Sequence, residues 1–188
     1  MRIASILALG FGLLTIAPSV AAADTPNADT AKMADRLVND PRVEALDPYG
    51  LRLPPVVRAD RGVQFGKALR MPLKGHADFW RGGVTTPVPK PVRKGDQIVV
   101  AFWARAEETE NGAPGKIGRG QLETTPAVRA IFEQPFTVGP EWTMHQQKGI
   151  ADQDYGPRQR NAALHLDSAK QVLDLGPVFV LDYGQPAQ

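Results

Sequence analysis

The sequence of 188 residues contains no cysteine. This absence excludes disulfide bonds, thiol catalysis and cysteine-ligated metal sites. Histidine is scarce too, with three in the chain, and no two of them stand at a spacing that would hold a metal ion. Phosphate-binding loops and dinucleotide-binding fingerprints are also missing. Stability must therefore come from a hydrophobic core or from a bound ion.

Neither sign of charge dominates, and serine is rare. Lys and Arg number 22 against 20 Asp and Glu, and no basic cluster forms a phosphate-binding stripe, so we expect no nucleic-acid partner. After residue 23 the chain has one serine, Ser168. The run from His165 to Ser168 contains the residue types of a catalytic triad. It lacks the glycines of a nucleophile elbow and is too short for triad geometry, so Ser168 is expected to be a turn hydroxyl.

The N-terminus has the pattern of a secretory signal peptide. Arg2 precedes an apolar run over 3–16, and three alanines over 21–23 form a small-residue cleavage site. The run is too short to span a membrane, and no later stretch reaches about 20 apolar residues. We therefore expect a signal peptide over 1–23, export to the periplasm or the extracellular space, and no membrane span.

Glycine and proline are frequent and scattered, with 18 and 17 occurrences. Turn residues between short apolar runs are typical of an all-β sandwich or barrel. We predict a leader with a short helix near 31–38 inside 24–55, followed by a β-sandwich over 56–188. The expected strands are 67–73, 84–92 as an edge strand or an extended lead-in, 95–106, 127–134, 140–147, 161–166 and 171–183. We also expect a long loop over 107–120, and Trp142 and Met144 facing inward.

The strand over 95–106 organises this prediction. A Gly-Asp turn precedes a run rich in β-branched and aromatic residues. Side chains alternate between the two faces of a strand, so Ile98, Val100, Phe102 and Ala104 should face a core. Trp103 and Arg105 share the opposite face. They would form a ligand platform, or Trp103 would cover a second layer or a loop while Arg105 extends past it.

Four further polar or aromatic residues are candidates for a binding site: Trp80, Arg129, Glu133 and His165. Each also has a structural interpretation, such as a hydrophobic plug for Trp80 or a solvated surface position for His165. Paired carboxylates for glycoside hydrolysis would have to be recognised by their geometry.

Four stretches resemble jelly-roll carbohydrate-binding modules of the xylan- and glucan-binding type, which have a galactose-binding-like fold. They are Lys94-Gly95-Asp96 with the Phe-Trp-Ala-Arg-Ala of 102–106, the strand over 65–70, Pro140-Glu141-Trp142, and the closing strands over 164–166, 171–175 and 178–180. The resemblance extends from Val56 to Tyr183. It implies an all-β jelly-roll sandwich.

The resemblance also implies a function. Such modules stack aromatic rings on sugars and bind the sugar hydroxyls with polar side chains, so the expected partner is a polysaccharide or oligosaccharide. Trp103, Arg105, Trp80, Arg129, Glu133 and His165 are then the ligand-binding candidates. Many such modules hold a structural calcium, for which Asp174 and Asp182 are candidate ligands, and most accompany a glycan-processing enzyme. The alternatives are a sandwich that binds another protein and a small glycan-cleaving hydrolase.

Overall fold

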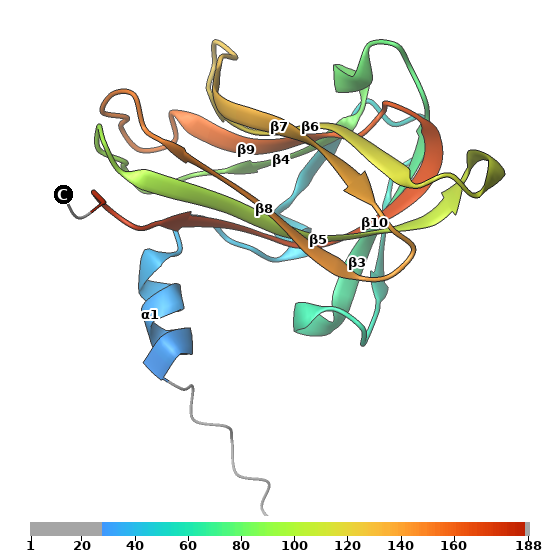
Figure 1. Cartoon of the computed structure of the whole chain (residues 1–188), viewed down its shortest axis with the longest axis horizontal. Helices are drawn as coiled ribbons and strands as arrows, with labels where there is room; N and C mark the ends of the chain where they lie inside the picture. The colour runs from blue at the N-terminus through green and yellow to red at the C-terminus, as the bar shows by residue number, and fades with distance from the viewer. Residues whose placement is uncertain (1–27, 187–188) are drawn as a thin grey trace, which may run out of the picture.

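The computed structural model describes residues 28–186 and shows two stacked five-stranded antiparallel sheets (Figure 1). This confirms the prediction of an all-β sandwich. In spatial order the first sheet contains β1 (Asp47–Tyr49), β4 (Gly83–Pro87), β9 (Arg160–His165), β6 (Gly115–Thr124) and β7 (Ala130–Val138). The second contains β2 (Val56–Ala59), β3 (Lys67–Lys74), β10 (Lys170–Asp182), β5 (Gln97–Thr109) and β8 (Thr143–Ile150).

The core lies between the two sheets, and β5 shows why. Ile98, Val100, Phe102 and Ala104 are completely buried, as the alternation of the strand predicts. They meet apolar side chains of the first sheet, such as Leu122 on β6. Truncating a buried aromatic side chain in such a core typically costs several kcal/mol, so this layer holds the sandwich together.

The residues that precede β2 in the chain also contact the two sheets. The helix α1 (Ala28–Arg36) leads into a β-bridge between Leu37 and Leu181 of β10. The buried Asn39 side chain then donates to Val178 O at 2.8 Å and accepts from Val180 N at 2.8 Å. The strand β1, which lies within the expected leader over 24–55, pairs with β4. None of the described helices has the length and apolarity needed to cross a bilayer. The expected signal peptide lies outside the described residues.

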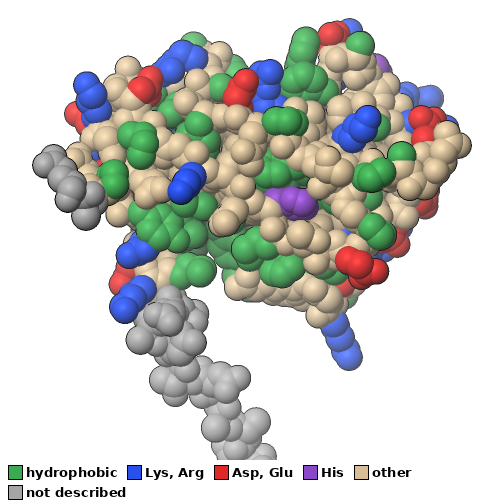
Figure 2. All heavy atoms as spheres, in the orientation of Figure 1, with side chains coloured by type: hydrophobic (Ala, Val, Ile, Leu, Met, Phe, Trp, Pro, Cys, Tyr) green, Lys and Arg blue, Asp and Glu red, His purple; other side chains and the backbone are tan. Residues whose placement is uncertain are grey.

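Four local predictions are wrong. The strand β4, expected as an edge, lies between β1 and β9. The expected loop over 107–120 is a tight connection, because β5 continues to Thr109 and β6 starts at Gly115 after a short 3-10 turn. Met144 is exposed, and its neighbour His145 turns to the core side against Phe102. Figure 2 shows hydrophobic side chains and one histidine gathered along this side of the molecule, between the edges of β7 and β8.

A further correction concerns β7. Alternation over 127–134 predicts that Val128, Ala130 and Phe132 share a face, but Val128 is exposed and precedes the strand. Ala130 pairs with Glu123, Phe132 pairs with Leu122, and the register shifts between them. Such a bulge places one extra residue in the strand and so exchanges the faces of its side chains. Phe132 consequently packs against the core.

Candidate functional site

The outer face of the first sheet carries a hollow of about 570 Å³, which we call the groove. Residues of all five strands of this sheet and of the adjoining connections line it. They are Tyr49, Phe79, Trp80, Thr85, Arg119, Gln121, Glu123, Val128, Ala130 and His165. Most of them stand far apart in the sequence, so the strand pairing has to bring them together.

Strand register explains why these side chains share a face. Tyr49 pairs with Gly83, Gly83 with His165, and His165 with Arg119, which makes one row across four strands. Paired residues on neighbouring strands point to the same side of a sheet. In the next row Thr85, Ala163, Gln121 and Glu133 follow one another, and in the third Glu123 stands between Asn161 and Ala130. Polar residues at alternate positions of β6 therefore form a line along the groove.

A glycine makes room for the first row. A Cβ atom on Gly83 would lie 2.2 Å from the Leu164 carbonyl oxygen and 2.7 Å from the Tyr49 hydroxyl, closer than real Cβ contacts allow. Because Gly83 has no side chain, Tyr49 crosses it, and its hydroxyl lies 2.6 Å from His165 Nδ1. Tyr49 and His165 are thereby fixed against each other at the bottom of the groove.

One wall of the groove is aromatic. The short 3-10 turn η3 (Phe79–Arg81) presents Trp80, whose side chain is 54% exposed. The Phe79 ring supports it edge-on, with ring centroids 5.1 Å apart. The guanidinium of Arg119 lies 5.1 Å from the Phe79 centroid, a favourable cation–π distance. Val128, which is 70% exposed, contributes an apolar surface elsewhere on the rim.

Buried polar groups form the part of the lining contributed by β6. Gln121 and Glu123 are both buried, and the Gln121 amide donates to the Glu123 carboxylate. Burial raises the pKa of Glu123 above its ordinary value, although the Gln121 hydrogen bond opposes the shift. The Oε1 atom of Gln121 is buried and has no partner among the described residues. Unpartnered buried acceptors are costly, and this atom is closed to solvent.

The other titratable side chains of the groove are Arg119, His165 and Tyr49. Arg119 forms an ion pair with Glu133 at 3.1 Å, so its charge is compensated from β7. Burial lowers the pKa of His165, and the positive charge of Arg119 lowers it further. Burial raises the pKa of the Tyr49 hydroxyl. Near neutral pH the groove therefore offers hydroxyl, imidazole and amide groups, which suit a ligand rich in hydroxyls.

The structure places the six candidate ligand-binding residues of the sequence analysis at different locations. Trp80 and His165 line the groove, and Glu133 joins it through its ion pair with Arg119. Arg129 turns elsewhere and contacts Asp152 at 3.0 Å and the Tyr155 hydroxyl at 2.8 Å. Trp103 and Arg105 lie on β5, in the second sheet. The expected set is therefore not one site.

The position of Trp103 requires a correction of its expected role. Its side chain is half-buried and packs with Ala101, Phe179 and Leu181 in a small apolar cluster on the outer face of the second sheet. Its Nε1 atom is inaccessible and has no partner among the described residues. Val63, which is buried within the connection from β2 to β3, approaches Gly176 from the same side as Trp103: a Cβ on Gly176 would lie 2.5 Å from Val63 and 2.8 Å from Trp103. The indole thus packs in an apolar cluster, which agrees with a structural role for Trp103.

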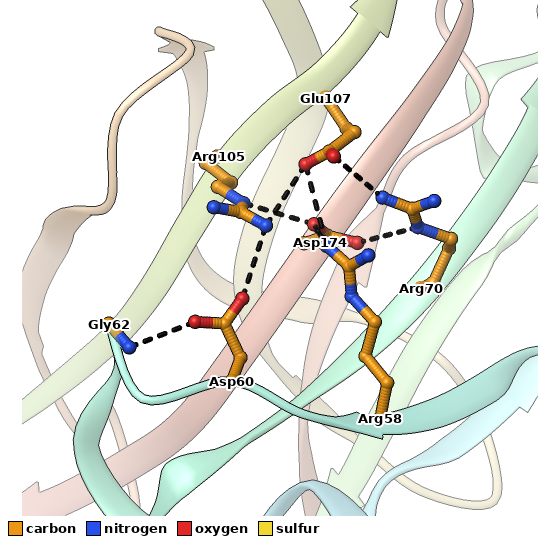
Figure 3. A network of polar contacts seen from close by, with 7 residues as sticks. All are labelled: Arg58, Asp60, Gly62, Arg70, Arg105, Glu107 and Asp174. Atoms are coloured by element: carbon orange, nitrogen blue, oxygen red, sulfur yellow. Dashed lines mark hydrogen bonds and ion pairs between the residues drawn. The ribbon is translucent and has the colours of Figure 1, made fainter.

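Arg105 belongs to a network of ion pairs around Asp174 (Figure 3). The Asp174 side chain is fully buried and receives hydrogen bonds from Arg58, Arg70 and Arg105. Burial alone would raise the pKa of Asp174, but the bonds from Arg70 and Arg105 outweigh it and keep this pKa below its ordinary value.

Two further acids complete the network. Glu107 contacts Arg70 and Arg105 at 3.0 Å each, and Asp60 contacts Arg105 at 3.1 Å. Three cations thus meet three anions, and the guanidinium of Arg105 also lies 5.0 Å from the Trp142 ring centroid. Because acids in the network balance its charge, Arg105 has a structural role and is not free to donate hydrogen bonds to a ligand.

The calcium expectation does not fit the residues present. Ca²⁺ takes six to eight oxygen ligands, but arginines occupy the oxygens of Asp174. Asp182 lies beside Asp96 and accepts a hydrogen bond from Gly184 N at 2.8 Å, and burial raises its pKa. Within residues 28–186 no group of three or more histidine or acidic side chains is arranged to hold a metal ion.

Sequence reasoning missed several groove residues, namely Tyr49, Arg119, Gln121 and Glu123. The signal for three of them was present, because 119, 121 and 123 are polar and alternate with Gly120 and Leu122. Placing a loop over 107–120 concealed the start of that alternation. Tyr49 had no such signal, since its role depends on pairing with Gly83.

Comparison with known proteins bears on the fold. No protein-family model matches the chain, and no curated protein does. A CBM4 carbohydrate-binding module superposes with a TM-score of 0.56 at 14% identity, covering 74% of this chain and 95% of the module. The second N-terminal cellulose-binding domain of Cellulomonas fimi β-1,4-glucanase C gives 0.54 at 17% identity and covers 81% and 95%.

A third structure, the CBM22-1 xylan-binding domain of Paenibacillus barcinonensis Xyn10C, gives a TM-score of 0.52 at 14% identity and covers 81% of this chain and 94% of that domain. At these identities the likeness shows the fold alone. The chain has the β-sandwich fold of carbohydrate-binding modules.

Proposed function

We propose that this chain binds a polysaccharide or oligosaccharide in the groove and does not cleave it. The observation that carries the proposal is the exposed Trp80 ring standing beside the buried polar line of Gln121 and Glu123. An indole offers a flat apolar surface to a sugar ring, and amide and carboxyl groups bond hydroxyls. The likeness in fold to carbohydrate-binding modules supports this choice of ligand.

The non-catalytic part of the proposal rests on the carboxylates. Most glycoside hydrolases place two carboxyl groups on either side of the scissile bond. Among the described residues that line the groove, Glu123 is the one acid, and it already accepts the Gln121 amide. Glu133 is occupied by Arg119 at 3.1 Å. The groove is therefore equipped to hold a glycan and lacks the second acid for hydrolysis. We also propose export, based on the sequence over 1–23.

Affinity electrophoresis in gels containing soluble xylan or mixed-linkage β-glucan tests the proposal. Trp80→Ala should weaken binding by about 2 kcal/mol, roughly thirtyfold in Kd, because it removes the exposed ring at the wall of the site. Phe65→Ala is the matched control: the Phe65 ring is also 54% exposed but lies outside the groove.

The assay also has to distinguish the role of Trp80 from that of Trp103. Trp103→Ala should lower the melting temperature, because it opens the small apolar cluster, and should leave gel retardation in place. If Trp80→Ala binds like the wild type while Trp103→Ala loses binding with an unchanged melt, the groove is the wrong site. If neither polysaccharide retards the wild type, and a glycan array shows no binding, glycan recognition itself is refuted.

A further inference from the structure

The hydrogen bond between Tyr49 and His165 decides what the bottom of the groove offers to a ligand. The Tyr49 hydroxyl lies 2.6 Å from His165 Nδ1, and within residues 28–186 neither side chain forms another hydrogen bond. A hydroxyl can donate or accept, and a neutral imidazole has one protonated and one bare nitrogen. The two possible directions of this bond therefore leave opposite chemistry at His165 Nε2.

The phenol is the donor in this pair. Its oxygen shares electron density with the ring and accepts weakly, whereas the bare nitrogen of a neutral imidazole is basic and accepts strongly. Burial and the positive charge of Arg119 lower the pKa of His165, so the imidazole is neutral near pH 7. Burial and the nearby Glu123 raise the pKa of Tyr49, so the phenol keeps its proton. Tyr49 consequently donates to Nδ1, and Nε2 carries the imidazole proton.

The Nε2–H group has no acceptor in the described part of the chain. Nε2 forms no hydrogen bond there, and it is not among the side-chain atoms that the fold closes off from solvent. In its row His165 stands between Gly83, which has no side chain, and Arg119, whose guanidinium only donates. His165 itself lines the groove. The Nε2–H is thus an unused donor in the lining, and its acceptor has to come from a ligand.

Two ring contacts hold the imidazole in place. The Tyr49 ring meets it at 76° with centroids 6.3 Å apart, and the Phe79 ring meets it at 62° with centroids 6.1 Å apart. The turn η3 that carries Phe79 is fastened close to the end of β9, because Asp167 N donates to Phe79 O at 3.2 Å. A donor fixed in this way loses little entropy when it binds a ligand.

We propose that Tyr49 is a positioning residue for glycan binding. Its hydroxyl donates to His165 Nδ1 and thereby keeps the imidazole as the tautomer whose Nε2–H donates to an oxygen of the bound sugar. This inference rests on the proposed function of the groove, and it adds that the glycan places an acceptor oxygen at His165. Without the Tyr49 hydroxyl either nitrogen can carry the proton, and part of the molecules would present a bare Nε2 instead.

Nitrogen-15 NMR of the free chain tests the tautomer without any glycan. At about pH 8, above the ordinary histidine pKa of about 6.5, wild-type His165 should show a pyridine-type Nδ1 shift and a pyrrole-type Nε2 shift. In Tyr49→Phe the two shifts should move toward each other, because both tautomers become populated. A pyrrole-type Nδ1 in the wild type, or unchanged shifts in Tyr49→Phe, would overturn the proposal.

Affinity electrophoresis on the polysaccharide that retards the wild type tests whether the ligand uses this donor. Tyr49→Phe should weaken binding about fivefold, the effect of one lost hydrogen bond. His165→Leu should weaken it at least as much. Adding Tyr49→Phe to His165→Leu should cause no further loss, because Tyr49 acts through the imidazole. Tyr155→Phe is the matched control and should bind like the wild type, since it removes a hydroxyl that bonds Asp152 and Arg129 outside the groove.

The results separate this role from glycan binding itself. If the wild type binds and Tyr49→Phe binds equally well, or if Tyr49→Phe weakens binding as strongly in the His165→Leu background, Tyr49 does not act through His165 and glycan binding still stands. If no glycan retards the wild type, glycan binding is refuted and the donor role with it. Should a variant fail to fold, the wild type still decides the question: a bound oligosaccharide should shift Nε2 and leave Nδ1 pyridine-type, and an unshifted Nε2 at saturation would overturn the proposal.

Discussion

Replacing Asp174 by Asn is the strongest test of the ion-pair network on the second sheet. The substitution keeps the shape of the side chain and removes its charge, so that Arg58, Arg70 and Arg105 face two acids instead of three. Removing one partner from a buried ion pair typically costs 3–5 kcal/mol. The three arginine side chains are 23–30% exposed, so water partly solvates the excess charge and the lower end of that range applies. We expect a loss of about 3 kcal/mol in the free energy of unfolding.

Urea denaturation followed by tryptophan fluorescence measures this loss, and calorimetry should show a melting temperature lower by roughly 6–12 °C. Asp78→Asn is the matched control, because its pair with Arg81 is exposed at 44% and 59%. Exposed pairs contribute at most about 1 kcal/mol. A loss below 1 kcal/mol for Asp174→Asn, or a gain in stability, would refute the interpretation of the network as a stabilising balance of charge.

The pH dependence gives a second check of the same variant. Since the folded protein holds the pKa of Asp174 below its ordinary value, the carboxylate contributes its full stability above about pH 4, the unfolded pKa. That contribution decreases as the pH falls through the folded pKa. The difference between wild type and Asp174→Asn should therefore shrink below about pH 4. A difference that stays constant down to pH 2.5 would show that charge is not its cause.

Three further predictions concern the core and the groove. Phe102→Ala should cost about 3–5 kcal/mol in chemical denaturation, because the ring is completely buried between the sheets; a loss under 1 kcal/mol would contradict the strand assignment. Burial lowers the pKa of His145, so its contribution to stability is present above the unfolded pKa of about 6.5 and lost as the pH falls. His145→Phe should flatten the melting curve against pH between 7 and 5, and an unchanged slope would exclude His145 as its source. Burial raises the pKa of Glu123, so its contribution is lost as the pH rises above the unfolded pKa of about 4.3. Glu123→Gln should consequently melt higher than wild type at pH 8 and show little difference at pH 4; the reverse order would contradict the buried position of this acid.

Local alternation was sufficient to predict the parts of the fold in which one strand has one buried face. The four core residues of β5 were predicted because each second residue is apolar from Ile98 to Ala104. The same reasoning failed at β7, where the bulge near Ile131 exchanges the faces. It failed also at Met144, because β8 is an edge strand with polar residues on both sides.

The site was harder to predict than the fold, because it depends on contacts between distant segments. Trp80 and His165 were found by residue type, but nothing local relates Tyr49 to His165, 116 positions away. Trp103 was correctly placed away from the main core. Its role depended on Val63, which arrives from the connection between β2 and β3 and packs against the same glycine. The position of the β2–β3 connection over Trp103 depends on tertiary contacts, and the alternation of residues in β5 does not predict it.

The bridge between Leu37 and Leu181 has a practical consequence for engineering. At this bridge the chain enters the sandwich beside its last strand, β10, and Figure 1 shows α1 and the C-terminal end near one another. A circular permutant could therefore join these two ends with a short linker and be opened at the turn around Asn111. The domain could equally be inserted into a surface loop of a host protein through two closely spaced junctions. Trp80 lies on the other sheet's outer side, so neither junction would obstruct it.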